Sequence, residues 1–249
     1  MTSAFIGVTV LVALYSLWVR RDTWWSRWEI GVSTAIALEC AALVLMSPWA
    51  AETIGSPLHR AAHIWNLQQL VGHLFLVVAI AANSHHVLLR LADHERIRPL
   101  FRRHVVWPVR IGLLALVVVF VVADAGYRPD GLSTSGEVWA NVYWVLWCGL
   151  LIYLSGCATR LLLAVRDDPR AKETVELYTA SSAFALAAMM AQLSTTWSKN
   201  DASTLVWFCA CVSVTIFAYG SARSWQAKAA WFHTGRLPVS ENNPPQPLA

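Results

Sequence analysis

Charged side chains are scarce in this sequence, and lysine is nearly absent. Charged residues make up only 14% of the 249 positions, whereas a globular domain carries about 25%. Lysine accounts for only 3 of the 19 basic residues. Hydrophobic residues reach 57%, and the mean hydropathy is +0.48. The shortage of charge and the uncharged runs, such as "IGLLALVVVFVVA" at 111–123, exclude a soluble globular domain and predict a polytopic membrane protein.

Several signatures of enzymes and receptors are also missing. The sequence has no G-x-S-x-G, Walker or H-E-x-x-H pattern, and none of its five cysteines forms a C-x-x-C pair. The lysines, which a retinal Schiff base would require inside a span, fall in connections or the tail. The last apolar run has no histidine, which excludes metal hydrolases of the adiponectin-receptor type. We therefore expect a protein that is not an enzyme and has no cofactor.

Seven apolar runs are long enough to cross a bilayer, which takes about 17–25 residues of helix. They are 3–19, 29–47, 65–89, 106–124, 138–160, 175–197 and 203–222. The fold class predicted from this pattern is all-α, a membrane bundle of seven transmembrane helices.

The distribution of basic residues predicts the orientation of the bundle. The first, third and fifth connections with the run ends that border them, together with the segment after the last run, hold 16 of the 19 basic residues, and the other connections hold only Arg60, Arg128 and Lys199. Because arginine and lysine concentrate on the cytoplasmic side, we expect an outside N-terminus and a cytoplasmic C-terminus in the inner membrane.

The third connection is the most basic, and its arginines should attract anionic lipid headgroups. These lipid-headgroup candidates are Arg90, Arg96, Arg98, Arg102 and Arg103. A nucleic-acid partner is excluded because the arginines occupy short connections rather than one folded basic face. The expected partners are the lipid bilayer and another membrane protein or a second copy of the chain.

Three regions are predicted along the chain. Residues 1–223 form the transmembrane domain. Residues 224–237 form a short basic helix, with Trp225, Ala229 and Phe232 on one face, that lies at the inner membrane surface. Residues 238–249 are rich in proline and asparagine and should be disordered.

The stretch "SPLHRAAHIWNLQQLVGHLF" (56–75) places several polar residues at the start of the third run. Ser56 followed by Pro57 resembles a helix start, which predicts one long helix, or two collinear pieces, from Pro57 to Leu89. At helical spacing, one polar stripe results, formed by His59, His63, Asn66 and His73. His59 and His63 are four residues apart and could share a metal, or both could be solvated at the interface.

Buried polar groups in the other runs suggest a site. Glu39 is the only acid deep in the second run, at a depth similar to that of His73, and an ionisable group in a span needs a partner. We predict a Glu39–His73 hydrogen bond; the alternative is a protonated Glu39 bonded to a backbone carbonyl or to a hydroxyl. Together with Asn66 and His73, the remaining candidates for a ligand or proton site are Glu39, Gln69, Asn141 and Gln192. They could line an outward-facing polar cavity or form ordinary hydrogen bonds between helices.

One motif carries a resemblance. The "N-L-x-x-L-x-G-H" core, here Asn66, Leu67, Leu70, Gly72 and His73, resembles the third-span region of actinobacterial integral membrane proteins that are labelled as transporters. Such proteins are frequently encoded beside a zinc metallopeptidase or a regulator. The resemblance implies a seven-helix bundle and emphasises Asn66 and His73, but it transfers no reaction.

Three functional hypotheses follow. The leading one is a non-enzymatic membrane protein that acts in sensing, binding or envelope interaction; in a phage or prophage it would serve exclusion or immunity. The second is a proton-coupled transporter or carrier that uses Glu39 and His73. The third is a haem-binding redox protein, because His85, His86 and His104 lie near the cytoplasmic face.

Overall fold

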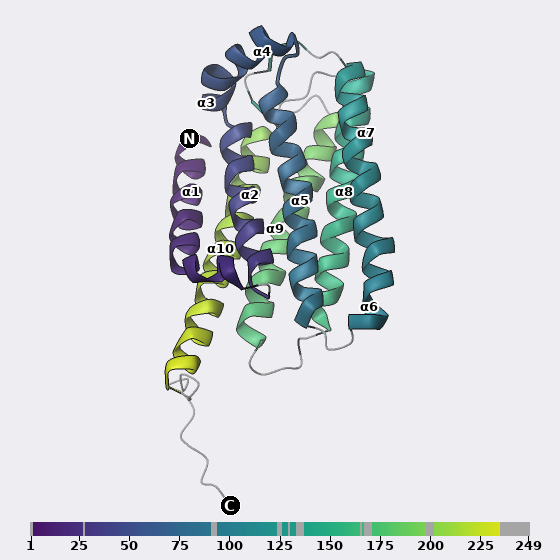
Figure 1. Cartoon of the computed structure of the whole chain (residues 1–249). Helices are drawn as coiled ribbons and strands as arrows, with labels where there is room; N and C mark the ends of the chain where they lie inside the picture. Colours follow the sequence, from purple (N-terminus) through teal and green to yellow (C-terminus); the bar gives the residue numbers. More distant parts are fainter. Residues whose placement is uncertain are drawn as a thin grey trace, which may run out of the picture.

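The computed structural model of the chain describes residues 2–26, 28–90, 94–123, 126–128, 130–132, 137–164, 166, 171–197 and 202–234, and these residues contain helices and no strand. Seven of the helices are long and stand side by side (Figure 1). They are α1 (Thr2–Val19), α2 (Ile30–Met46), α5 (Leu67–Arg90), α7 (Trp107–Ala123), α8 (Val138–Leu163), α9 (Lys172–Trp197) and α10 (Ser203–Thr234). Shorter helices connect them: η1 (Arg21–Trp25), α3 (Pro48–Ala50), η2 (Ala51–Gly55), α4 (Ser56–Ala62), α6 (His94–Phe101) and η3 (Arg102–Val106).

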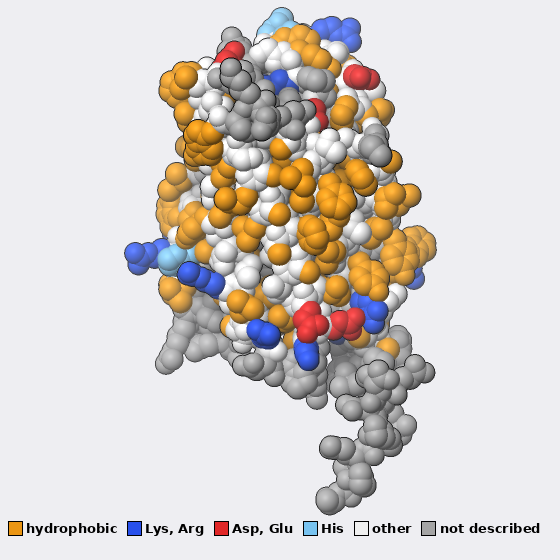
Figure 2. All heavy atoms as spheres, turned by 180° about the vertical axis from the view of Figure 1, so that it is seen from behind, with side chains coloured by type: hydrophobic (Ala, Val, Ile, Leu, Met, Phe, Trp, Pro, Cys, Tyr) orange, Lys and Arg blue, Asp and Glu red, His pale blue; other side chains and the backbone are white. Residues whose placement is uncertain are grey.

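Length and apolar composition identify this chain as a membrane protein. Five helices in the described part are long and apolar enough to cross a bilayer, and a sixth is added if α2 and its bent continuation through Ala62 form one span. The helix α9, which covers the predicted run 175–197, does not meet that measure, and its sequence is rich in serine and threonine. The face in Figure 2 shows hydrophobic side chains across its middle, with acidic and basic side chains toward its ends.

The connection from α2 to α5 differs from the predicted long helix. Ser47 accepts a hydrogen bond from the Ala50 amide at 3.2 Å and Pro48 follows, so the capped helix start lies here, while α4, which begins at Ser56, has no side-chain cap. The segment Pro48–Ala62 is bent by 63° from α2 and crosses the upper end of the bundle in Figure 1. His63 and Asn66 then adopt φ values of 56° and 61°, so α5 begins at Leu67. The prediction of one helix, or of two collinear pieces, from Pro57 to Leu89 is wrong, because these left-handed residues break the helix and α4 lies across the end of the bundle while α5 runs along it (Figure 1).

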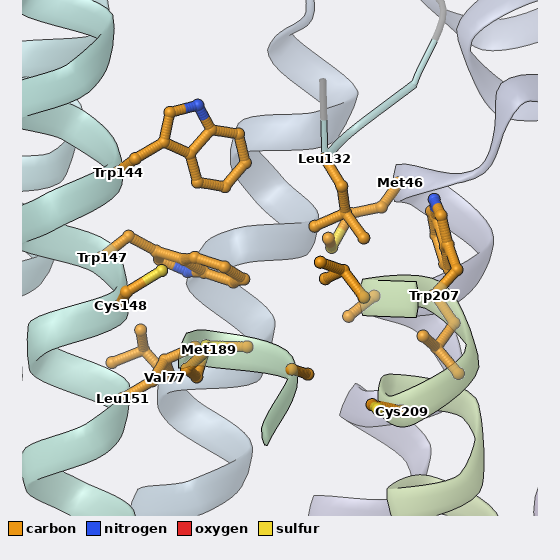
Figure 3. Close-up of a cluster of buried hydrophobic side chains, with 14 of the residues drawn as sticks. Met46, Val77, Leu132, Trp144, Trp147, Cys148, Leu151, Met189, Trp207 and Cys209 are labelled. Carbon is orange, nitrogen blue, oxygen red and sulfur yellow. The ribbon is translucent and has the colours of Figure 1, made fainter. Parts of the chain in front are cut away.

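The core is built from large side chains of helices that are distant in the sequence. Figure 3 shows Trp144 and Trp147 projecting from α8, with Met46, Leu132 and Trp207 on the other side of the cluster. The two tryptophans of α8 and Trp207 of α10 are at most 1% exposed. Burial of aromatic groups of this size dominates packing energetics.

At the lower end of the bundle in Figure 1, a buried ion cluster joins the first and last helices. Arg20 is 1% exposed; it donates to Glu29 Oε2 at 3.0 Å and to the Ser221 carbonyl at 3.0 Å. The other carboxylate oxygen of Glu29 lies 2.6 Å from Lys228 Nζ. Residues 224–234 continue α10 without a break, so they do not form the separate helix that the sequence predicted, and the predicted tail 238–249 lies outside the described residues.

Candidate functional site

The described part of the connection between α7 and α8 packs against the upper end of the bundle through Gly131 and Leu132. We call its described residues, 126–128 and 130–132, the plug. The Gly131 amide donates to the Met46 carbonyl at 3.0 Å, and Leu132 is 4% exposed. A Cβ atom at Gly131 would lie 2.8–3.0 Å from atoms of Met46, so only glycine permits this close approach.

Asn66 and Gln69 hold the first half of the plug. The Asn66 side chain donates to the Gly126 carbonyl and accepts from the Arg128 amide, both at 3.0 Å. Gln69 Nε2 donates to the Arg128 carbonyl at 3.1 Å. Both side chains are 3% exposed, and the Asn66 carbonyl also accepts the first amides of α5. Asn66 and Gln69 therefore supply the hydrogen-bond partners of three backbone groups of the plug.

His73 holds the second half of the plug, and its hydrogen bonds fix its protonation. Nε2 lies 3.0 Å from the Gly131 carbonyl, which can only accept, so Nε2 carries the proton. Nδ1 then accepts from the Tyr143 hydroxyl at 2.7 Å. Both ring nitrogens of the neutral imidazole are thus engaged, and the predicted Glu39–His73 hydrogen bond is wrong.

Residues from α9 and α10 complete the attachment. Gln192 Nε2 donates to the Leu132 carbonyl at 3.1 Å, and Trp207 Nε1 donates to the Asp130 carboxylate at 2.9 and 3.0 Å. Sequence reasoning missed Asp130, Trp207 and Tyr143. The Asp130–Gly131 pair is a turn signal that could have marked the plug, but no pattern in the sequence indicates that Tyr143 faces His73.

Four of the six candidate polar residues therefore meet at the plug, and each donates to one of its backbone carbonyls. Asn141 does not join them, and its Oδ1 is buried without a partner among the described residues. Of the two metal candidates, His59 stacks on Trp65 with ring centroids 3.6 Å apart, and His63 is the C-cap of α4. The described residues include no group of three or more metal-ligating side chains.

A small cavity of about 140 Å³ lies beside the plug. Its walls combine aromatic rings, among them Trp65 and Phe120, with the side chains that hold the plug. Arg128 also lines it. Burial lowers the pKa of the Arg128 guanidinium, while Glu137 opposes this shift. An arginine remains charged in proteins, so this cavity has a positively charged wall.

A second cavity, of about 110 Å³, lies between α2, α5, α8, α9 and α10, and we call it the bundle cavity. Most of its lining side chains are apolar, and its residues are not shared with the cavity beside the plug. Glu39 lies in its wall with Oε2 buried and without a hydrogen-bond partner among the described residues. The Oδ1 atom of Asn83, another lining residue, is in the same situation.

The packing of α2 against α5 gives the depth of Glu39. These helices are antiparallel, with Gly31 against Ala82 and Gly72 against Ala42. This register places Glu39 near the level of Leu76, about one helical turn below His73. The predicted similarity in depth is correct to about one turn, but Glu39 and His73 line different cavities.

The residues expected near the cytoplasmic face do not converge. His85 contacts Phe101, His86 Nδ1 bonds the Trp28 carbonyl, and His104 Nδ1 lies 3.1 Å from the Tyr153 hydroxyl. Among the lipid-headgroup candidates, Arg98, Arg102 and Arg103 are exposed. The side chains of the other two, Arg90 and Arg96, lie outside the described residues.

Comparison of the chain with family models, with curated proteins and with solved structures finds no match in any of the three.

Proposed function

We propose that this protein is a seven-helix inner-membrane protein that binds a small molecule in the bundle cavity and acts in sensing or binding rather than catalysis. Its N-terminus lies outside and its C-terminus in the cytoplasm. Two observations support seven spans: α9 packs between α8 and α10, and basic residues alternate between connections. The exposed arginines of the α6–η3 segment face lipid headgroups or another membrane protein. In a phage or prophage, such a protein would serve exclusion or immunity.

The observation that carries the proposal is the composition of the bundle cavity. Ligand sites are mostly apolar pockets with a few polar groups that fix orientation. The bundle cavity matches this description, with Leu43, Ile80 and Val214 among its apolar walls and Glu39 and Asn83 as its polar groups. An ionisable residue inside a membrane bundle is energetically costly, and its presence there points to a functional role. Because Glu39 Oε2 makes no hydrogen bond in the described part, a ligand is the partner that such a group requires.

The plug connects this cavity to the upper surface. Leu132 of the plug lines the bundle cavity, and so does Trp207, which bonds Asp130 of the plug. The plug is therefore the roof of the cavity. A ligand that contacts Leu132 and Trp207 changes the free energy of plug closure. Ligand occupancy therefore changes the conformation of the plug at the upper end of the bundle.

A matched pair of substitutions on α9 tests ligand binding. Ala185 lines the bundle cavity, whereas Ala187 is exposed on the same helix and does not line it. Ala185→Phe should fill the cavity and Ala187→Phe should leave it open. Purified protein in a fixed detergent is titrated with 1-octanol, and the increase in melting temperature is measured. We expect a saturable increase in the wild type and in Ala187→Phe, and its loss in Ala185→Phe. Equal responses in all three would refute a cavity ligand.

The orientation is tested separately with single cysteines at Arg60 and Arg98, in a background in which the five native cysteines are replaced. A membrane-impermeant maleimide should label Arg60→Cys in intact cells and Arg98→Cys only after permeabilisation. The reverse pattern would refute the proposed orientation.

A proton-coupled carrier is the second candidate, and the buried Oε2 of Glu39 in a cavity favours it. In this version Glu39 acts without His73, whose ring nitrogens are engaged by the plug and Tyr143. The expected result is proton-coupled uptake in proteoliposomes that Glu39→Gln abolishes. Unchanged flux in that variant, or no flux in the wild type, would refute the carrier.

A further inference from the structure

We propose that the ligand of the bundle cavity is an amphiphilic amine, whose ammonium group binds Glu39 while its short apolar part lies among the aliphatic and aromatic walls. The inference rests on the proposed function, because it assumes that the bundle cavity is a binding site. It adds the chemical class of the ligand and the side chain that selects it.

The first step is that Glu39 requires a donor which the cavity does not supply. An ionised carboxylate in an apolar environment is costly unless it is paired, and the lining residues of the bundle cavity include no lysine or arginine. Several of its hydroxyls are already committed. Ser181 and Ser213 bond one another reciprocally, and Ser182 donates to the Tyr178 carbonyl. No cationic side chain in the lining can pair with Glu39, so a ligand can supply the missing positive charge.

The second step is that the donor is cationic. An ammonium group offers three donors and a positive charge, and hydrogen bonds between two ionised groups are shorter and stronger than neutral ones. The low dielectric of the bundle strengthens this pair further. A carboxylate ligand would place a second negative charge beside Glu39 and is therefore disfavoured.

The third step is that the cation is organic. Inorganic cations such as Ca²⁺ take six to eight oxygen ligands, whereas the neighbours of Glu39 along α2 and α5 in this wall are Leu43, Met46, Leu76 and Ile80. Contacts with these side chains stabilise a ligand only where they bury its apolar surface. Trp147 and Trp207 also line the cavity, and Figure 3 shows Trp147 projecting from α8 into the cluster of buried side chains.

The size of the cavity limits the apolar part. One water molecule occupies about 10–15 Å³ of cavity volume. The 110 Å³ of the bundle cavity therefore corresponds to roughly seven to eleven water-sized groups. A short alkyl amine matches this space, and a two-chain lipid does not.

The experiment compares three probes that share one eight-carbon chain: octylamine, 1-octanol and sodium octanoate. Melting temperatures are recorded at fixed detergent and ionic strength for the wild type, Glu39→Gln, Ala185→Phe and the control Ala187→Phe. We expect apparent affinity for octylamine at least tenfold above that for 1-octanol in the wild type, and the weakest response with octanoate. Glu39→Gln should reduce the octylamine affinity to the 1-octanol level while the 1-octanol response persists, which also shows that the variant is folded.

The outcomes separate this inference from the proposed function. Equal affinities for octylamine and 1-octanol in the wild type, both lost in Ala185→Phe, would overturn the amine and leave the binding function intact. Responses to every probe that are identical in the wild type and Ala185→Phe would overturn both. A melting temperature that is higher in sodium chloride than in choline chloride, with no such difference in Glu39→Gln, would identify an inorganic cation as the ligand and overturn the amine. The probe comparison on the wild type requires no variant.

Discussion

Replacing His73 with phenylalanine tests whether the polar cluster exists to hold the plug. The change keeps an aromatic ring in the core but removes the hydrogen bond to the Gly131 carbonyl and leaves the Tyr143 hydroxyl without its partner. A hydrogen bond inside a membrane bundle contributes about 0.6–1.7 kcal/mol, and a stranded buried group costs about 1–3 kcal/mol. We therefore expect His73→Phe to destabilise the closed plug by about 2–4 kcal/mol.

Hydrogen–deuterium exchange of the plug amides measures this effect directly. Since about 1.4 kcal/mol corresponds to a factor of ten, the opening equilibrium should increase roughly 30- to 700-fold. The Gly131 amide, bonded to the Met46 carbonyl, is the most informative position. Exchange within twofold of the wild type would refute the assignment of His73 as a holder of the plug.

Two further variants sharpen the test. Tyr143→Phe added to His73→Phe removes the stranded hydroxyl, so the double variant should be more stable than the single one by about 1 kcal/mol or more. His59→Phe is the matched control, because phenylalanine can keep the stacking on Trp65. It should change plug exchange by less than about 0.5 kcal/mol. A double variant less stable than His73→Phe would contradict the hydrogen-bond account.

Two other predictions concern packing and charge. Gly131→Ala should destabilise the closed plug by about 1–3 kcal/mol, because its Cβ would lie within 3.0 Å of the α2 backbone. The control Gly126→Ala places its Cβ in open space and should be neutral. Equal hydrogen exchange of the plug amides in the two variants would contradict this prediction. Glu29→Gln should destabilise the protein by about 3 kcal/mol because it leaves the buried Arg20 without its carboxylate, as measured by chemical denaturation. Glu173→Gln, which breaks an exposed pair, should cost less than about 1 kcal/mol, and an equal loss in both would refute the role of burial.

The helical bundle could be predicted from the sequence because hydropathy alone determines which segments enter a bilayer. All seven predicted runs coincide with long helices, although only five or six meet the measure of length and composition for a span. The break before α5 could not be predicted, because His63 and Asn66 adopt left-handed φ values that tertiary contacts of the plug support. Pro57 was a misleading start signal, since Ser47 and Pro48, nine residues before Ser56 and Pro57, carry the cap.

The candidate site was predicted as a set of residues but not as a geometry. Spacing along a helix showed that Asn66, Gln69 and His73 required polar partners in the membrane. It did not show that these partners are carbonyls of a loop about 60 residues away. The predicted Glu39–His73 pair considers side-chain partners only. It omits the backbone carbonyls, which are the largest source of hydrogen-bond acceptors in a protein.

The cluster at Arg20 has a consequence for biosynthesis. Along α1, Thr9, Ser16 and Arg20 donate to carbonyls of Cys211, Ala218 and Ser221, each about 200 residues later in the chain. At a translation rate of about 5–20 residues per second, roughly 10–40 s pass between the synthesis of α1 and the synthesis of these acceptors. During that interval its polar face has no α10 to bind, so a translocon, a chaperone or transient water must shield it. Among the described helices, α10 is the last to be synthesised, and a chain that stops before Ser203 leaves the Arg20 guanidinium without the Ser221 carbonyl that accepts from it.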